Sequence, residues 1–200
     1  ASYKEGVQST LDDFPGMTIA SWQQRPDSIG FVRARSADPF EQPDILFNYL
    51  DREEDREGFR RCLRLTREII AQPAFDRFRG EEIAPGSDVR NDDDIDAWVR
   101  ETMESTYHPC GSCRMGEDAM AVVDSELRVH GIGGLRVIDS SVFPAEPNAN
   151  LNAPTIMLAE RASDMVRGKP LLAASNAEVG VAPGVGVTQR SGTPIRAVRH

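Results

Sequence analysis

Two short segments of the sequence carry side chains that could act together on a substrate. In residues 107–116 His108 precedes a proline and is followed by small residues, and in residues 148–155 Asn150 stands just before a helical pattern. An unperturbed imidazole has a pKa of about 6.5, so a histidine can exchange a proton at neutral pH. A carboxamide can hold an oxygen atom by a hydrogen bond without changing its charge. If the fold brings His108 and Asn150 together, they form a proton-transfer site; otherwise His108 is an ordinary structural histidine.

The two segments belong to a series of spaced motifs. In chain order these motifs are His108 to Gly116, Val122-Val123-Asp124, Gly134 to Ser141, and Asn150-Leu151-Asn152. Together they resemble the C-terminal signature of the glucose-methanol-choline (GMC) family of flavin-dependent oxidoreductases. Sequence motifs upstream, between residues 25 and 73, are similar to those of the choline dehydrogenase branch of that family. The whole resemblance covers residues 17–168.

The resemblance implies a function, a cofactor and the residues that serve them. The function is FAD-dependent oxidation of a primary alcohol, choline-like, to the aldehyde, with His108 and Asn150 as the catalytic pair. Asp139 and Ser140 are expected near the FAD pyrophosphate and ribityl chain, and Asn152 and Thr155 near the flavin ring. Without the resemblance, Asp139 would be a strand-end turn residue and Asn152 a plain helix cap. The small alcohol substrate and the electron acceptor, whether oxygen, a quinone or another carrier, stay open.

The chain lacks the nucleotide-binding turn that the family carries near its N-terminus. That turn reads Gly-x-Gly-x-x-Gly after a strand and receives the pyrophosphate on backbone amides. The nearest candidate, residues 131–136, has an arginine at the last glycine position and leads into a strand, so we interpret it as a turn. We therefore expect a C-terminal part of a longer enzyme, inactive alone, whose partner is the missing N-terminal FAD-binding half.

Composition narrows the classes of partner. A net charge of -9 and a pI near 4.9 argue against nucleic acid, because phosphate binding needs clustered Lys and Arg. No apolar run reaches the length of about 20 residues that spans a bilayer. Three cysteines, an odd number, do not suggest a disulfide scaffold and favour a reducing compartment, with the cytoplasm as the default and membrane association as an open alternative.

The expected fold class is α+β: an antiparallel substrate-domain sheet with helices, plus the closing strand and helix of an FAD-binding α/β domain. Apolar spacing predicts amphipathic helices over residues 52–72 and 92–106. A strand pair at residues 17–23 and 30–36, with a turn at 25–28, predicts a hairpin. The expected division is a substrate-binding part at 1–106, the signature segment at 107–170 and a disordered tail at 171–200.

Short strands are also expected at residues 121–124, 127–130 and 135–139, followed by a loop and a helix that Asn152 caps and Gly168 ends. The buried stripe of that helix is predicted to be Ile156, Ala159, Ala162, Met165 and Val166.

Two other functions remain as alternatives. Cys110 and Cys113 form a Cys-x-x-Cys pair, and with His108 they could build a small zinc or thiol redox module. A zinc site needs a fourth ligand at a recognisable spacing, and none is present. The resemblance implies instead that these cysteines pack near the flavin, so free thiols and no metal are expected. The last alternative is a noncatalytic remnant that only binds a partner.

Overall fold

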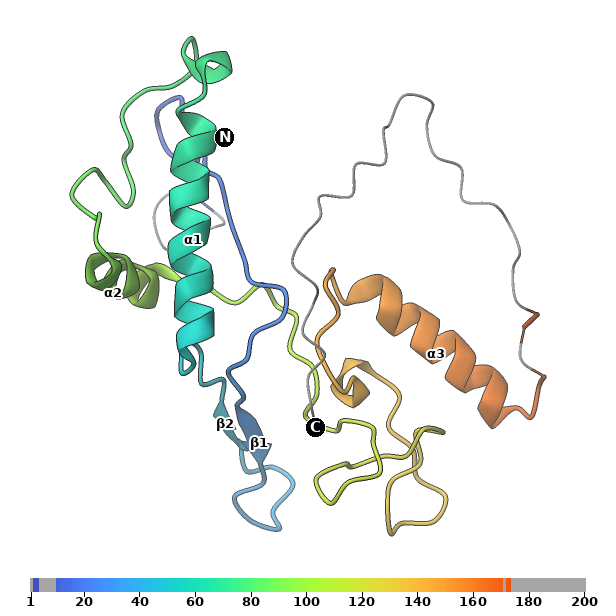
Figure 1. Ribbon diagram of the computed structural model, residues 1–200. Helices are drawn as coiled ribbons and strands as arrows, with labels where there is room; N and C mark the ends of the chain where they lie inside the picture. The colour runs from blue at the N-terminus through green and yellow to red at the C-terminus, as the bar shows by residue number, and fades with distance from the viewer. Residues whose placement is uncertain (1, 4–9, 171, 174–200) are drawn as a thin grey trace.

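The computed structural model describes residues 2–3, 10–170 and 172–173. Within them the elements follow the order β1 (Phe31–Arg33), β2 (Asp44–Leu46), α1 (Glu53–Ile70), the 3-10 helix η1 (Pro73–Phe75), α2 (Asp92–Thr102), the 3-10 helix η2 (Ser140–Val142) and α3 (Asn152–Val166). Helices and a small antiparallel sheet make this part of the chain α+β, as expected (Figure 1). The predicted tail lies almost wholly outside the described residues.

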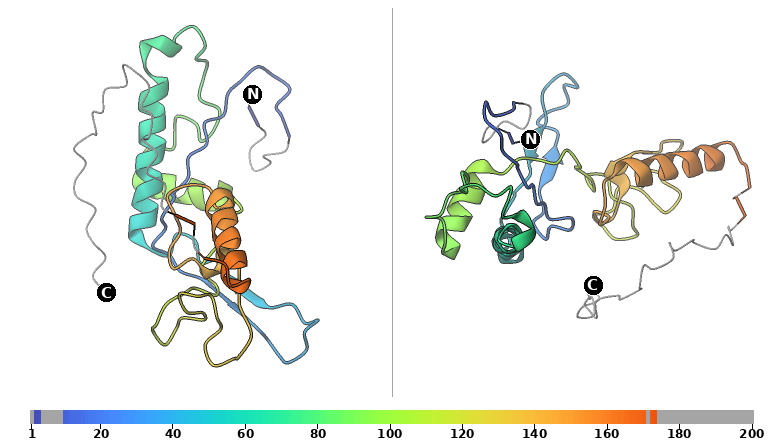
Figure 2. Two further views of the ribbon diagram at one scale, coloured as in Figure 1. Left: turned by 90° about the vertical axis from the view of Figure 1, so that its right-hand side faces the viewer. Right: turned by 90° about the horizontal axis from the view of Figure 1, so that it is seen from above.

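The elements form two regions, each with its own buried cluster. Helices α1 and α2 and the β1–β2 pair lie together, whereas α3 lies apart from them with the long loops that precede it (Figures 1 and 2). The first region buries Leu50, Ile95 and Val99. The second buries Val123, Leu127, Val142, Leu158 and Ala162. The predicted active-site segments all belong to the second region.

The sheet is smaller than predicted and pairs different segments. Phe31 lies opposite Leu46 and Arg33 opposite Asp44. The predicted hairpin between residues 17–23 and 30–36 is wrong, because residues 17–23 run beside α1 without strand pairing. Ser21 Oγ lies 3.4 Å from Thr66 Oγ1, a contact that holds the segment against that helix.

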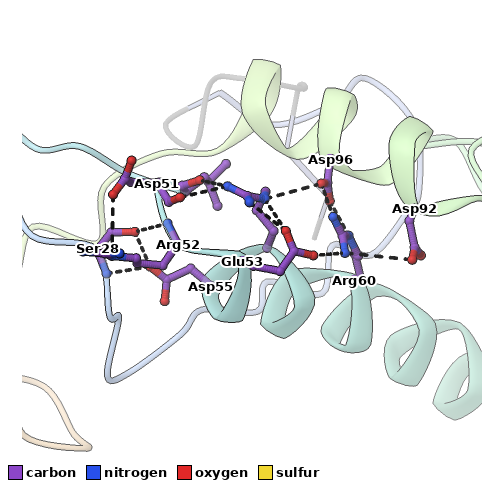
Figure 3. Close-up of polar contacts among 10 residues, drawn as sticks. Ser28, Asp51, Arg52, Glu53, Asp55, Arg60, Asp92 and Asp96 are labelled. Carbon is purple, nitrogen blue, oxygen red and sulfur yellow. Dashed lines mark hydrogen bonds and ion pairs between the residues drawn. The ribbon is translucent and has the colours of Figure 1, made fainter.

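The buried carboxylate of Asp55 explains why residues 25–28 do not close the predicted hairpin. Asp55 is only 2% exposed, and its oxygens accept hydrogen bonds from Gln23 Nε2 at 2.7 Å and from the backbone amides of Asp27 and Ser28 at 2.8 Å each. The Ser28 hydroxyl donates a further bond (Figure 3). The same hydroxyl accepts from the amide of Arg52 at the start of α1. The turn is therefore fastened to the helix, not to a neighbouring strand.

Helix α1 is confirmed close to its predicted limits, and Pro73 begins η1 immediately after it. Part of its charged face contacts α2 instead of solvent. Arg60 donates two hydrogen bonds to Asp96 of α2, one of them 2.6 Å long (Figure 3). These two side chains are 13% and 19% exposed, and Glu53 also accepts from Arg60. An ion pair of this two-pronged kind fixes one helix against the other.

Helix α2 begins as predicted and ends earlier. The Asn91 side chain caps it by accepting from the amide of Asp94 at 2.9 Å, and Ile95 and Val99 are its buried residues. The helix stops at Thr102, four residues short of the predicted 106, because Met103 turns to an extended backbone with ψ of 143°. Met103 packs against the first cluster in that conformation. The following residues therefore cross to the second region as an irregular segment.

The second region contains less regular structure than predicted. The three expected short strands form single bridges, Met115 with Val123, Val123 with Val129, and Arg128 with Arg136. The turn at residues 131–136 is confirmed, since Gly131 and Gly134 both have φ of 76°. These isolated bridges hold the loops around the buried Val123, and they do not join into a continuous β-sheet.

Helix α3 is confirmed in extent, and Gly168, with φ of 64°, follows its end. Its predicted buried stripe is only partly right. Leu158 and Ala162 are buried, one turn apart on the face toward the second cluster, whereas Ile156 and Val166 are 55% and 56% exposed. Among residues 2–3, 10–170 and 172–173, none of the helices has the length and apolar character that crossing a bilayer requires.

Candidate active site

A solvent-open hollow of about 430 Å³ joins the two predicted catalytic segments. It is lined by Tyr107, His108, Pro109, Ser140, Leu151, Asn152 and Thr155. Four of the six site residues predicted from the sequence, His108, Ser140, Asn152 and Thr155, therefore meet at one place. They come from three separate parts of the chain: the segment after α2, the start of η2 and the first turn of α3.

Backbone hydrogen bonds hold the histidine segment beside η2. The amide of Cys113 donates to Ser141 O at 2.9 Å, and that of Met115 to Val142 O at 2.8 Å. The Ser140 hydroxyl donates to Pro109 O at 3.4 Å, one residue from His108. Because Val142 is fully buried, this pairing anchors the histidine segment to the second cluster.

Two backbone conformations shape the histidine segment. Gly111 has φ of 82°, a backbone conformation that glycine adopts without strain, so the glycine allows the turn beside Phe143 O. Tyr107, the residue before His108, also has a positive φ, 60°, which is uncommon outside glycine. Its side chain is 80% exposed, whereas His108 is half-buried. The turn therefore exposes the phenol ring and lets the imidazole line the hollow.

The first turn of α3 presents free backbone amides at the hollow. The helix begins at Asn152 itself, and Leu151, in the capping position, makes no side-chain cap. The prediction that Asn152 caps the helix is therefore wrong: it is the first helical residue. The Thr155 hydroxyl donates to Leu151 O at 2.6 Å, so it does not cap the free amides either. An uncapped helix start favours negative charge beside it.

The hollow fits the cofactor that the sequence resemblance implies. A flavin gains negative charge on its pyrimidine when it is reduced, and the free amides of Asn152 and Ala153 could receive that charge. Imidazole, hydroxyl and carboxamide groups line the same hollow, from His108, Thr155 and Asn152.

Asn150 and Asp139, the other two predicted site residues, are not among the lining residues. Asn150 is exposed, one position before the lining residue Leu151. Asp139 precedes η2, and its carboxylate accepts from the amide of Ser141 at 2.8 Å, which is the local turn role considered from the sequence. Their roles toward substrate and FAD stay predictions.

The arginine of the signature, Arg114, has a local partner. It donates to Asp118 through both terminal nitrogens, one bond being 2.8 Å long. These bonds and the positive charge lower the pKa of Asp118 to about 2. Asp118 also accepts from the amide of Met120, so Arg114 organises the turn that follows the histidine segment.

Glu146 lies within electrostatic range of His108, which the sequence alone did not indicate. Burial raises the pKa of the Glu146 carboxyl above its ordinary value, and the charge of His108 opposes that rise. Burial also raises the pKa of the Cys110 thiol, and the negative charge of Glu146 adds to it. The sequence feature that could have drawn attention to Glu146 is its position between Pro144 and Pro147, in a short loop that leads to α3.

The cysteines show no sign of the alternative module. Cys62, Cys110 and Cys113 are all free and half-buried, and the last two lie in the histidine segment. Within the part of the chain that the structure describes, no three His, Cys, Asp or Glu side chains are grouped to hold a metal ion.

Comparisons with known proteins agree on one family. Residues 26–159 match the family model described as GMC oxidoreductase. An oxygen-dependent choline dehydrogenase of Vibrio vulnificus is 53% identical over 186 residues, which is 92% of this chain and 33% of that protein. Among solved structures, pyridoxine 4-oxidase from Mesorbium loti aligns with a TM-score of 0.68 and 30% identity over 74% of this chain and 29% of that one. An FAD-dependent oxidoreductase from Chaetomium thermophilum aligns with a TM-score of 0.68 and 32% identity, over 72% of this chain and 25% of that one.

The chain thus spans about a third of the length of the curated relative described above.

Proposed function

The chain belongs to the GMC oxidoreductase family, and on that premise we propose that it is the C-terminal part of an FAD-dependent enzyme that oxidises a primary alcohol to the aldehyde. One observation carries the proposal: His108 and the uncapped first turn of α3 line the same hollow. A proton acceptor and a site for negative charge are the two features that alcohol oxidation by a flavin requires.

In this proposal His108 accepts the hydroxyl proton of the alcohol on a ring nitrogen. Asn150 holds the same oxygen by a hydrogen bond, which orients the carbon that is oxidised. Asn150 stands one residue before the lining residue Leu151, on the loop that leads into the hollow. The proton acceptor and the orienting amide would thus come from two separate segments of the chain.

FAD would be held by Asn152 and Thr155 near the flavin ring and by Asp139 and Ser140 near the pyrophosphate and ribityl chain. When bound, it supplies the acceptor for the hydride that leaves the substrate carbon. The free amides at the start of α3 stabilise the charge that develops beside them. Ser140 already donates to Pro109 O, so it also keeps the histidine segment in place.

The proposed substrate is a choline-like alcohol. Support comes from the relative of Vibrio vulnificus, described as an oxygen-dependent choline dehydrogenase, at 53% identity. A cationic head group would need an aromatic face or a carboxylate. Tyr107, 80% exposed at the rim of the hollow, and Trp22, 47% exposed, are the aromatic candidates on this chain. Oxygen, a quinone or another carrier would then take the electrons.

The division of labour along the chain is part of the proposal. Residues 1–106 would belong to the substrate-binding domain, and residues 107–170 would complete the active site and the FAD-binding domain. The N-terminal FAD-binding half would be the partner of both. Exposed apolar side chains of the small sheet support this, since Val32, Ile45 and Leu46 are 53%, 54% and 46% exposed. Apolar surface of this kind is usually covered in the assembled protein.

Anaerobic mixing of the complete flavoprotein with alcohols tests the proposal. Choline and a panel of simple primary alcohols are added in turn, and the absorbance of the oxidised flavin is followed. The proposal expects bleaching by choline or another small alcohol. A complete protein that binds FAD but bleaches with no alcohol would contradict it.

A further inference from the structure

Leu151 is a buried apolar residue that lines the hollow and belongs to neither core cluster. It is 5% exposed, whereas every other buried apolar residue that the structure describes is part of the first or the second cluster. Leu151 is instead one of the lining residues of the hollow. Leucine side chains are buried where the surrounding groups exclude water. Leu151 therefore marks the closed end of the hollow.

The exposure of the other lining residues shows which end of the hollow is open. Tyr107 is 80% exposed and Pro109 is also exposed, so both lie at the open end. His108 is half-buried, and Leu151 is buried. A small molecule that enters past Tyr107 and reaches His108 therefore meets the Leu151 side chain at the inner end. Apolar walls of this kind, with a few polar groups that fix orientation, are typical of sites for small molecules.

Hydrogen bonds fix the backbone of Leu151 in this place. Its carbonyl oxygen accepts from the amide of Thr155 at 2.9 Å and from the Thr155 hydroxyl at 2.6 Å. Its backbone is already helical, with φ of -71° and ψ of -17°. Because both bonds must break before this backbone can turn, the Leu151 side chain is a fixed wall of the hollow.

We propose that Leu151 determines specificity: its side chain leaves room for one carbon substituent on the carbon that is oxidised, so that primary alcohols react and secondary alcohols are excluded. The inference rests on the proposed function, since it names the residue that selects the substrate class at the same site. In that function His108 and Asn150 hold the alcohol oxygen, and Leu151 directly follows Asn150. The carbon bonded to that oxygen thus comes within reach of the Leu151 side chain.

A methyl group on that carbon is the smallest change that probes the wall. A secondary alcohol carries a carbon substituent where a primary alcohol carries a hydrogen. In an apolar pocket a difference of one methylene changes the rate about 10- to 200-fold. The side chain of Leu151 has no polar atom, so it discriminates by volume alone. The preference for primary alcohols should therefore fall as the side chain at this position becomes smaller.

The test compares Leu151→Ala with the control Leu158→Ala in the complete flavoprotein. Leu158 is a buried leucine of α3, 8% exposed, that belongs to the second cluster and is not among the lining residues. Anaerobic flavin reduction is measured with choline, or with the fastest primary alcohol of the panel, and with the same alcohol carrying a methyl group on the oxidised carbon. We expect the ratio of the two rates, primary over secondary, to fall about tenfold or more in Leu151→Ala. Leu158→Ala should keep the wild-type ratio, and Leu151→Val, a smaller change, should lower it less.

Binding of a tertiary alcohol gives a second measurement that needs no catalysis. The same alcohol with two methyl groups on the hydroxyl-bearing carbon has no hydrogen there to give up, so it can bind but cannot be oxidised. It is titrated into the oxidised flavoprotein and followed by calorimetry. It should bind Leu151→Ala about tenfold or more tightly than it binds the wild type or Leu158→Ala.

The two measurements separate the failure of this inference from that of the proposed function. If no alcohol reduces the wild-type flavin, the proposed function fails, and binding of the choline analogue with two methyl groups still decides whether Leu151 closes the hollow. The inference is overturned if the wild type oxidises the primary and secondary alcohols equally fast, or if the Leu151 variants keep the wild-type ratio or bind the tertiary alcohol no better. Leu151→Val decides both measurements if Leu151→Ala does not fold.

Discussion

Replacing Asp55 by Asn should strongly destabilise the first region. Asp55 is 2% exposed and accepts from Gln23, from the amide of Asp27, and from both the amide and the hydroxyl of Ser28. An asparagine of the same shape keeps one acceptor oxygen and turns an amino group toward the Ser28 donors. At least one backbone amide is then buried without a partner, which costs about 1–3 kcal/mol, and the remaining bonds lose the help of a full charge. We expect a loss of about 2–4 kcal/mol in the free energy of unfolding.

Urea unfolding followed by tryptophan fluorescence measures this loss, because Trp22 and Trp98 belong to the first region. Asp51→Asn is the matched control. Its carboxylate is 49% exposed and lies 3.6 Å from Arg52, a surface contact worth less than about 1 kcal/mol. If Asp55→Asn unfolds within about 0.5 kcal/mol of the wild type, the buried carboxylate does not anchor the turn at residues 25–28.

The pH dependence of the same difference has a definite sign. Burial alone would raise the pKa of Asp55, but the hydrogen bonds from Ser28, Asp27 and Gln23 outweigh it and the pKa is lowered. A lowered pKa means that the stabilisation is complete above the unfolded value of about 3.9 and is lost as pH falls through the folded pKa. The difference between wild type and Asp55→Asn should therefore be constant near neutral pH and shrink in acid.

Two further changes test the packing of the first region. Asp96→Asn should lower the free energy of unfolding by about 1–2 kcal/mol, because it weakens the charged pair with Arg60 between α1 and α2, whereas Glu101→Gln, exposed on the same helix, should change it by less than about 0.5 kcal/mol. Gly30→Ala should cost about 3 kcal/mol or more, because its Cβ would lie 1.8 Å from Leu46 O in the paired strand, and Gly133→Ala, with nothing within 4 Å, should be tolerated. Urea midpoints measure both pairs, and equal midpoints within either pair would contradict the packing described.

Periodicity predicted the helices well because their apolar spacing is set by contacts along one face. The Ile95 and Val99 face of α2 is buried as its spacing requires. Helix α3 was less predictable, since Ile156 and Leu158 are both apolar and only packing decides that Leu158 turns inward. The hairpin of residues 17–23 and 30–36 was predicted wrongly for a similar reason: no local pattern shows that Asp55 accepts from the amides of residues 27 and 28.

The candidate site was predictable through the family motifs more than through local physics. Spacing alone could not bring His108 to Asn152, because long-range backbone bonds from Cys113 and Met115 to Ser141 and Val142 first fix the histidine segment beside η2, and the hollow forms where that pair meets the start of α3. The resemblance supplied that convergence. It did not supply Glu146, because a glutamate between two prolines has no fixed meaning until the loop places it beside the histidine segment.

The central claim is that His108 takes the substrate proton in the hollow before α3, and one rate tests it most directly. Anaerobic flavin reduction by the best alcohol is measured in the complete flavoprotein for His108→Ala and for His130→Ala, whose ring lies on the turn at Gly116 O, 2.9 Å away. The account predicts that His108→Ala slows flavin reduction about 100-fold or more while His130→Ala does not. Reduction at an undiminished rate in His108→Ala would contradict it.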